Sequence, residues 1–197
     1  VIRDSDFDDL AHKSGEWLRG TGPESDIVIS SRIRLARNLA DFPFIRRCSD
    51  EDRISIERTV RAKMDSIDDW RDVRYIDLEQ LSEIDRQFLV ERQLISREIA
   101  DAEGSRAVAI DPSERYSVMI NEEDHLRIQV MHSGLDLKSA WQSINDLDDK
   151  LEDAILYAFH PQFGYLTACP TNVGTGLRVS VMLHLPALVI TRQIDKV

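Results

Sequence analysis

The chain has 197 residues, of which 42% are hydrophobic and 31% are charged, and its formal net charge is −11. This composition is typical of a soluble globular domain, and the acidic balance argues against a nucleic-acid binder, whose affinity depends on neutralising phosphates. No apolar run approaches the ~20 residues that span a bilayer. The two cysteines, Cys48 and Cys169, exclude a disulfide framework and favour a cytoplasmic location.

The first half of the chain is expected to contain two strands and two main helices. Residues 1–25 are interpreted as a polar lead-in with a short helix around Trp17. Ser49 precedes three acidic residues and then apolar residues at helical spacing, which predicts a helix over residues 50–66. The other elements expected here are a strand that begins in 26–39, a strand over 72–78, and a helix over 81–95 with Ser82 or Asp77 near its start.

The second half is richer in strands. One is expected over 106–112, two more within 115–132 joined at the NEED turn, and two over 164–171 and 176–186. Apolar residues at three- and four-residue steps predict one long helix, Leu137 to Phe159. Strands bunched between helices, without regular βαβ alternation, predict an α+β fold with a mostly antiparallel sheet flanked by helices. The apolar run near the end lacks a helix stop signal, so we expect the chain to be a fragment.

Three of the expected strands carry arginine on one face, because side chains alternate along a strand. Arg32 and Arg34 share a face in SSRIRLAR, Arg127 lies in the strand after NEED, and Arg178 opens the last strand. Arginine binds phosphate oxygens in a bidentate, charge-assisted manner. If the sheet brings these strands together, the cluster could clamp a polyphosphate without a P-loop, whose motif is absent. Isolated arginines on half-buried strands are the alternative.

The NEED turn places Glu122, Glu123 and Asp124 side by side. A solvated hairpin turn is one interpretation, and a site that attracts a cation is the other. If Glu123 and Arg127 both lie in a strand, four positions of about 3.3 Å separate them by roughly 13 Å, which excludes a direct salt bridge. The acidic segment NDLDDKLEDA, residues 145–154, is interpreted as the solvated face of the long helix.

Four motifs, in their order along the chain, resemble the ATP:guanido phosphotransferases, the family that contains the creatine and arginine kinases. They are SSRIRLARN, NEEDHLRI, CPTNVGTGLR and VSVMLHLPAL. The extended stretches GPESDIVISSRIRLARNL and GYLTACPTNVGTGLRVSVMLHLPALVITRQI are similar to the protein-arginine kinase branch of that family. The resemblance runs from about Trp17 to the end. It implies a phosphagen-kinase catalytic-domain fold, which is glutamine-synthetase-like, over residues 26–197, with its C-terminal part missing.

The resemblance also implies the chemistry. ATP is the expected phosphoryl donor, with Mg²⁺ held largely by nucleotide oxygens and water rather than by a protein metal site. Glu123 matches the carboxylate that orients the acceptor guanidinium and takes its proton, and Cys169 matches a thiolate beside that guanidinium. A small buried residue at a strand end is the alternative for Cys169, and Glu122 and Asp124 are expected to support the turn. The expected nucleotide-binding residues are Ser30, Ser31, Arg32, Ile33, Arg34, Arg127, Arg178, Val179, Ser180, Val181 and Met182.

Protein substrates bearing arginine are implied because SSRIR begins at Ser30, which leaves no room for the helical domain that precedes it in small-guanidine kinases. An activator of the McsA type, a Clp-type protease system and a dimer of the full-length protein are also implied, with no membrane or nucleic-acid partner. Two features of the family are missing from the sequence: an RGxxGE-like segment with a second carboxylate, and a histidine near QLIS, where Gln93 and Glu98 stand. Because of these gaps, a non-catalytic nucleotide-binding or regulatory relative is one alternative. A small-guanidine kinase, which shares the chemistry but acts on a different class of substrate, is the other.

Overall fold

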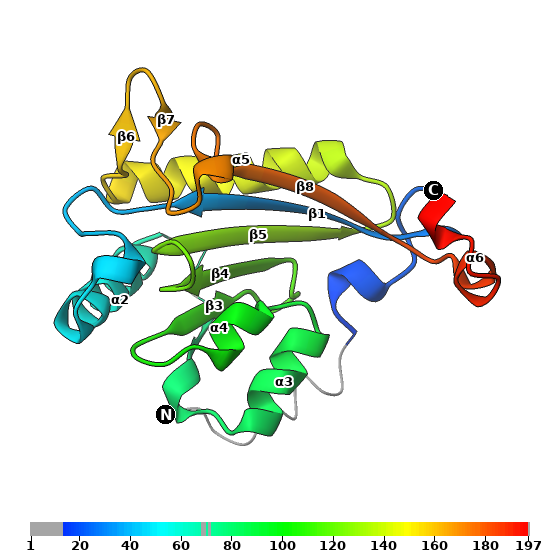
Figure 1. The fold of residues 1–197 in the computed structure, drawn as a ribbon, viewed down its shortest axis with the longest axis horizontal. Coiled ribbons are helices and arrows are strands. Elements are labelled where there is room, and N and C mark those ends of the chain that lie inside the picture. The colour runs from blue at the N-terminus through cyan, green and yellow to red at the C-terminus, as the bar shows by residue number, and fades with distance from the viewer. Residues whose placement is uncertain (1–13, 68–69, 71, 197) are drawn as a thin grey trace.

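The computed structural model describes residues 14–67, 70 and 72–196, and its centre is a six-stranded sheet with helices on both faces (Figure 1). The strand order is β2-β3-β4-β5-β1-β8, and each neighbouring pair is antiparallel. The predicted α+β fold with a mostly antiparallel sheet is therefore confirmed. The strands are β1 (Val28–Arg37), β2 (Arg74–Asp77), β3 (Ala107–Ile110), β4 (Tyr116–Ile120), β5 (Leu126–Ser133) and β8 (Leu177–Leu183), with a separate hairpin of β6 (Phe159–His160) and β7 (Gly164–Tyr165).

Two hydrophobic clusters hold the helices to the sheet. The larger cluster joins α2 (Asp50–Met64) and α5 (Leu137–Ala154) to β1, β4 and β5 on one face. The smaller joins α3 (Glu83–Glu91) and α4 (Arg97–Asp101) to β2, β3 and β4 on the other face. Shorter helical segments are η1 (Glu16–Leu18), η2 (Ile45–Arg47), η4 (Leu78–Gln80), η5 (Pro170–Asn172), α6 (Pro186–Ile190) and η6 (Ile194–Lys196).

Helix starts agree with the sequence because their signals are local. Ser49 and Ser82 each accept a hydrogen bond from the backbone of the third helical residue, and the side chain of that residue bonds back to the serine backbone. The first predicted helix, 50–66, is observed over Asp50–Met64. The second, predicted over 81–95, ends at Glu91, and the separate helix α4 follows it.

The long helix α5 is five residues shorter than predicted. It ends at Ala154, and the chain continues in an extended conformation from its C-cap, Ile155. Ile155 and Tyr157 are buried while Leu156 between them is 71% exposed. Over a run this short, apolar residues that alternate in an extended segment also fit the spacing of a helix. The helix was therefore predicted to continue to Phe159, and that end was wrong.

The predicted strand over 164–171 was also largely wrong. Only Gly164 and Tyr165 pair in β7, and the segment after Cys169 forms the 3-10 turn η5. In the lead-in, the short helix expected around Trp17 is the 3-10 turn η1, whereas residues 1–13 lie outside the described part. Among the described residues, no helix is both long enough and apolar enough to cross a bilayer.

Strand β8 lies at the edge of the sheet, and its apolar face is open. Leu177, Val179, Val181 and Leu183 are 36–46% exposed, whereas Ile33 on the neighbouring β1 is 2% exposed. The alternation that the sequence predicted for β8 is observed, but within the described residues the apolar side of this strand is not buried.

Candidate active site

Four arginines project from three adjacent strands onto the face of the sheet that carries α3 and α4. Arg34 of β1 lies directly opposite Arg178 of β8, and Arg32 lies opposite Ser180. Arg127 of β5 lies opposite Ala36, two residues along β1 from Arg34. Because residues paired across strands share a face, all four cations are on the same side of the sheet. The structure thus brings together the arginines that the sequence placed on separate strands.

Positive charge outweighs negative charge around Arg34. Burial, together with the neighbouring cations Arg32, Arg178 and Arg127, lowers the pKa of Arg34 to about 10, against an opposing effect of Glu122. Its Nε atom is buried and has no hydrogen-bond partner in the described part of the chain. Like charges directly opposite each other in a sheet are destabilising, so the arrangement favours a bound anion with several acceptor oxygens.

The loop between α3 and α4 contacts the cluster through a residue that the sequence did not assign to the site. Arg32 donates to Oε1 of Gln93 at 3.0 Å and to Oγ of Ser180 at 3.3 Å. Gln93 has a positive φ of 60° and its carbonyl accepts from Gln129 of β5 at 2.7 Å. A left-handed backbone conformation is uncommon for a residue other than glycine, and it marks Gln93 as a position of interest. This mark is visible in the structure and not in the sequence.

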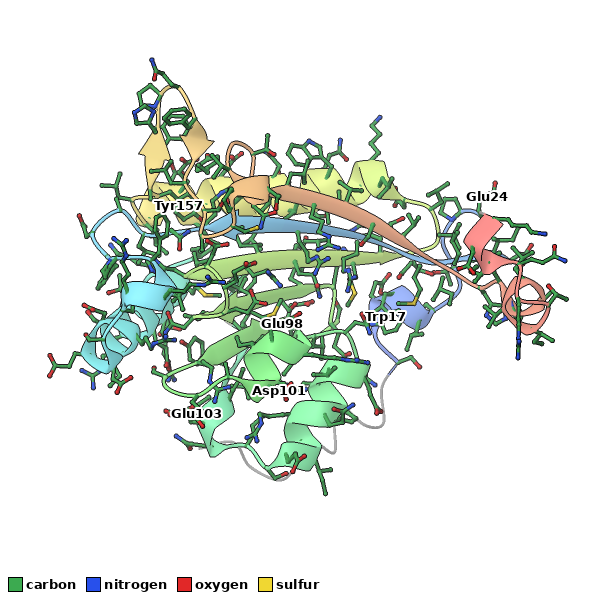
Figure 2. The ribbon with its side chains drawn as sticks, in the orientation of Figure 1. Trp17, Glu24, Glu98, Asp101, Glu103 and Tyr157 are labelled. Carbon is green, nitrogen blue, oxygen red and sulfur yellow. The ribbon has the colours of Figure 1, made fainter. Side chains whose placement is uncertain are left out.

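Glu98 of α4 also faces the cations, and Figure 2 shows it in front of the sheet. A hydrogen bond from its own backbone N–H is the largest cause that lowers the pKa of Glu98; burial opposes it, and the charges of Arg127 and Arg34 lower the pKa further. Glu98 therefore stays ionised beside the arginine cluster.

The NEED turn places its two glutamates differently. Glu122 is buried, and its carboxylate accepts from Nη1 of Arg127 at 2.6 Å, from Oγ of Ser96 at 2.8 Å and from the backbone N–H of Glu123 at 2.8 Å. Glu123 is 38% exposed at its side chain, and its Oε2 lies 3.3 Å from Nη2 of Arg127. The predicted separation of roughly 13 Å was wrong, because β5 begins at Leu126 and Glu123 lies in the turn.

Cys169 and Glu123 of the NEED turn line the same small cavity. The cavity has a volume of about 120 Å³, and its lining includes Arg34, Glu123, Arg127, Cys169 and Arg178. The thiol Sγ is 3.0 Å from Oγ1 of Thr171. A cavity of this size, with a carboxylate, a thiol and three cations around it, suits a planar cationic group that meets an anion.

Arg37 of β1 forms a buried ion pair with Asp148 of α5 and also binds the loop after Cys169. Arg37 donates from Nε and Nη2 to the carboxylate of Asp148 at 3.1 and 2.6 Å, and from Nη1 to the carbonyl of Thr175 at 2.9 Å. The ring of Tyr165 lies 3.7 Å from the guanidinium carbon. The ring of Tyr157, which Figure 2 labels at the base of the hairpin, also faces Arg37, with its centroid 5.8 Å from the guanidinium carbon. Asp148 belongs to the segment predicted to be a solvated face, and that prediction was wrong for this residue.

Some predicted nucleotide-binding residues have their side chains elsewhere. The side chains of Ile33, Val179 and Val181 lie on the opposite face of the sheet from Arg34. Only the backbone of these residues could contact a ligand on the cation face. Ser31 donates to the carbonyl of Gly134 at 2.7 Å, which commits its hydroxyl to a loop. The other predicted residues on the cation face are Ser30, Ser180 and Met182, in register with Arg32 and Arg34.

His125 is a structural residue. Its Nδ1 accepts from the backbone N–H of Leu39 at 3.0 Å, which assigns the proton to Nε2, 2.9 Å from the carbonyl of Pro43. Burial lowers its pKa, so the neutral ring is favoured. Because both ring nitrogens are bonded to backbone groups, neither is free to exchange a proton with a substrate.

The sequence of this chain is similar to known phosphotransferases. A family model for the ATP:guanido phosphotransferase C-terminal catalytic domain matches residues 55–197. The protein-arginine kinase of Symbiobacterium thermophilum is 50% identical over 187 residues, which cover 93% of this chain and 53% of that protein. The protein-arginine kinase of Halothermothrix orenii is 48% identical over 191 residues, covering 95% and 54%. The chain thus spans about half the length of the curated relatives it matches.

Solved structures share the same fold. The substrate-free duplicated taurocyamine kinase from Schistosoma mansoni has a TM-score of 0.74 and 29% identity, over 91% of this chain and 26% of that one. Lombricine kinase has a TM-score of 0.74 and 22% identity, over 93% and 56%, and at that identity supports the fold alone. The predicted phosphagen-kinase fold is therefore confirmed.

Proposed function

Because this chain belongs to the ATP:guanido phosphotransferase family, we propose that it transfers a phosphoryl group from ATP to the guanidinium group of arginine side chains in proteins. One observation carries the proposal: cations from three strands meet beside the carboxylate of Glu123 and the thiol of Cys169 around one cavity. The choice of protein arginine over a free guanidine compound is supported by relatives that are 44–50% identical and are named protein-arginine kinases.

The cation face would hold the triphosphate. In the proposed complex the terminal phosphate lies at Arg34, Arg127 and Arg178, and the chain of phosphates continues toward Arg32 and Ser180. Most of the barrier to phosphoryl transfer is lowered by positioning and charge stabilisation, which guanidinium groups supply. The buried, unpartnered Nε of Arg34 would gain a phosphate oxygen as acceptor. Ser30, Ser31, Ile33, Val179, Val181 and Met182 complete the proposed nucleotide site; those whose side chains lie on the opposite face of the sheet would contribute through their backbone.

The acceptor guanidinium would occupy the small cavity between Glu123 and Cys169. A nitrogen of the acceptor forms a bond to the terminal phosphorus while the bond from that phosphorus to the bridging oxygen of ADP breaks. The proton released from the guanidinium passes to the Glu123 carboxylate, whose exposure leaves it free to approach the substrate. Arg127 holds the turn in place through its ion pair with Glu122. Glu122 would therefore position the turn, while the adjacent Glu123 would accept the proton.

The proposal includes Mg²⁺ bound to the nucleotide. Within the described residues, no group of three His, Cys, Asp or Glu side chains is placed to hold a metal ion. Glu98 and Glu123 stand at the edge of the cation face and suit water-mediated contact with an ion that the phosphates carry. When bound, the ion supplies charge neutralisation between the terminal phosphates.

The wider proposal concerns the intact enzyme. We assign residues 26–197 to its catalytic domain, and the pairing of β1 with β5 and β8 supports a start before residue 55. Protein substrates with accessible arginine, a McsA-type activator, a Clp-type protease system, a dimer and a cytoplasmic location are expected by analogy with the family. The net charge of −11 disfavours nucleic acid as a partner.

The test is a transfer assay with Mg-ATP and an arginine-rich protein, read by mass spectrometry under conditions that preserve acid-labile phosphoarginine. Glu123→Gln removes the proposed proton acceptor and keeps its size, so we expect the yield of phosphoarginine to fall about 100-fold or more. Glu103→Gln is the matched control, because Glu103 is an exposed loop residue away from the cation face (Figure 2). It should leave the yield unchanged.

The alternatives have distinct outcomes. Binding of ATP without phosphoarginine, in this chain and in any longer product of its reading frame, would replace the kinase proposal with a nucleotide-binding module. Transfer to free arginine but not to protein would make the enzyme a small-guanidine kinase.

A further inference from the structure

One buried carboxylate, that of Asp124, joins the turn that carries Glu123 to the loop that carries Cys169. Asp124 is 1% exposed, and its Oδ1 accepts from the backbone N–H of Ala168 at 2.6 Å. Asp124 directly follows Glu123 in the sequence, and Ala168 directly precedes Cys169. A single short hydrogen bond therefore connects the immediate neighbours of the two residues that face the small cavity.

Asn38, the residue after β1, completes this connection. Its Nδ2 donates to the same Oδ1 of Asp124 at 2.6 Å and to the carbonyl of Leu166 at 3.0 Å. Its Oδ1 accepts from the backbone N–H of His125 at 2.9 Å. Asn38 is 2% exposed and follows the strand that carries Arg32 and Arg34. The turn, the loop and the cation strand thus meet at one buried pair of side chains.

This pair is an unusual choice for structure alone. The second oxygen of Asp124, Oδ2, is buried and has no hydrogen-bond partner in the described part of the chain. A buried carboxylate with an unpaired oxygen is costly, and a hydroxyl or amide oxygen could accept the same two hydrogen bonds without the charge. The carboxylate makes the hydrogen bonds to Ala168 and Asn38 shorter and stronger, because charge-assisted hydrogen bonds are roughly twice as strong as neutral ones.

We propose that Asp124 is a positioning residue that fixes the separation of the Glu123 carboxylate and the Cys169 thiol across the acceptor cavity without touching the substrate. Its effect on turnover rests on the function proposed above, whereas its effect on the position of Cys169 does not. Geometry of this kind matters for transfer, since a misplacement of about 1 Å can cost about 100-fold in rate.

Asp124→Asn tests the proposal, because it keeps the size of the side chain and removes the charge. The first readout is the rate at which iodoacetamide alkylates Cys169, measured in a Cys48→Ser background so that one thiol remains. Loosening of the loop should raise this rate about threefold or more, since thiol reactivity depends on access. The second readout is catalysis: we expect kcat to fall about 100-fold with the Kd for ATP nearly unchanged.

Asp111→Asn is the matched control. Asp111 also accepts backbone hydrogen bonds in a turn, from Tyr116 at 2.6 Å and Ser113 at 3.0 Å, but it lies at the far end of β4 from the NEED turn. It should change neither the alkylation rate nor kcat. If Asp124→Asn does not fold, as judged by circular dichroism, Asn38→Ala removes the other half of the connection and is read in the same two ways.

A double-mutant cycle separates positioning from general damage. If Asp124 acts through Cys169, Asp124→Asn should reduce kcat much less in a Cys169→Ala background than in the wild type. Additive losses, or an alkylation rate that matches the Asp111→Asn control, would overturn the proposal. Failure of the wild-type protein to form phosphoarginine would count against the proposed function, and the alkylation rates would still decide the role of Asp124.

Discussion

Replacing Asp148 by leucine should be among the most destabilising single changes in this chain. Asp148→Leu leaves the guanidinium of Arg37, whose side chain is 3% exposed, without its carboxylate partner. The hydrogen bonds from Nε and Nη2 of Arg37 are lost, and the contact with Thr175 that anchors the loop after Cys169 weakens.

The expected magnitude follows from the burial of both partners. Breaking a buried pair by removing one member typically costs about 3–5 kcal/mol, because an uncompensated charge remains inside. At about 2–4 °C per kcal/mol for a chain of this size, Tm should fall by roughly 6–20 °C. Burial raises the pKa of Asp148 against the opposing effect of Arg37, which shows that the pair itself carries a desolvation cost.

The double variant Arg37→Met/Asp148→Leu should therefore recover at least half of the lost stability, since an apolar pair of similar volume replaces a desolvated one. Urea titration followed by tryptophan fluorescence, with thermal melts alongside, measures the wild type and both variants. A loss below about 1 kcal/mol for Asp148→Leu, or a double variant less stable than the single one, would refute this account of the ion pair.

Three further predictions concern the site and its supports. Arg34→Gln should weaken ATP binding about 10–100-fold and raise the unfolding free energy by about 0.2–1 kcal/mol, because it relieves the repulsion with Arg178; calorimetry and urea titration measure the two effects. Gly176→Ala should cost more stability than Gly20→Ala, since both have φ near +60° but only at Gly176 would the new Cβ meet a carbonyl oxygen of β1, at 2.5 Å; equal melting temperatures would contradict this. Burial lowers the pKa of His125 below 6.5, so its contribution to stability is present above that pH and is lost as the pH falls, by at most about 1.4 kcal/mol per pH unit. The difference in unfolding free energy between the wild type and His125→Gln should therefore shrink from pH 8 to pH 5.

Features that depend on neighbours along the chain could be predicted from the sequence. The capping serines Ser49 and Ser82 start their helices as expected, since the hydrogen bonds that they make reach only three residues ahead. The alternation in SSRIRLAR and LRVSVML placed the arginines on one face of each strand, because side chains in a strand alternate whatever the rest of the fold does.

Features that depend on partners far apart in the sequence could not be predicted from it. Asp148 looked like part of a solvated helix face because its partner, Arg37, is 111 residues away in the sequence. Asp124 looked like a turn residue because the N–H that it binds is 44 residues away. The contact of Glu123 with Arg127 was missed for a local reason: treating the turn as strand stretched a 3.3 Å contact to roughly 13 Å.

The register of β8 against β1 has a consequence for how this site tolerates change. Arg178 and Ser180 lie on the cation side because the register pairs Arg178 with Arg34 and Ser180 with Arg32. This register is continuous until a bulge interrupts it between Val28 and Ser30. A register shift of one residue in β8 would exchange the two faces of that strand and present Val179 and Val181 on the cation side instead. Substitutions of the exposed Val179 and Val181 should therefore be tolerated, whereas an inserted or deleted residue between the Cys169 loop and β8 would invert the chemistry of the edge strand.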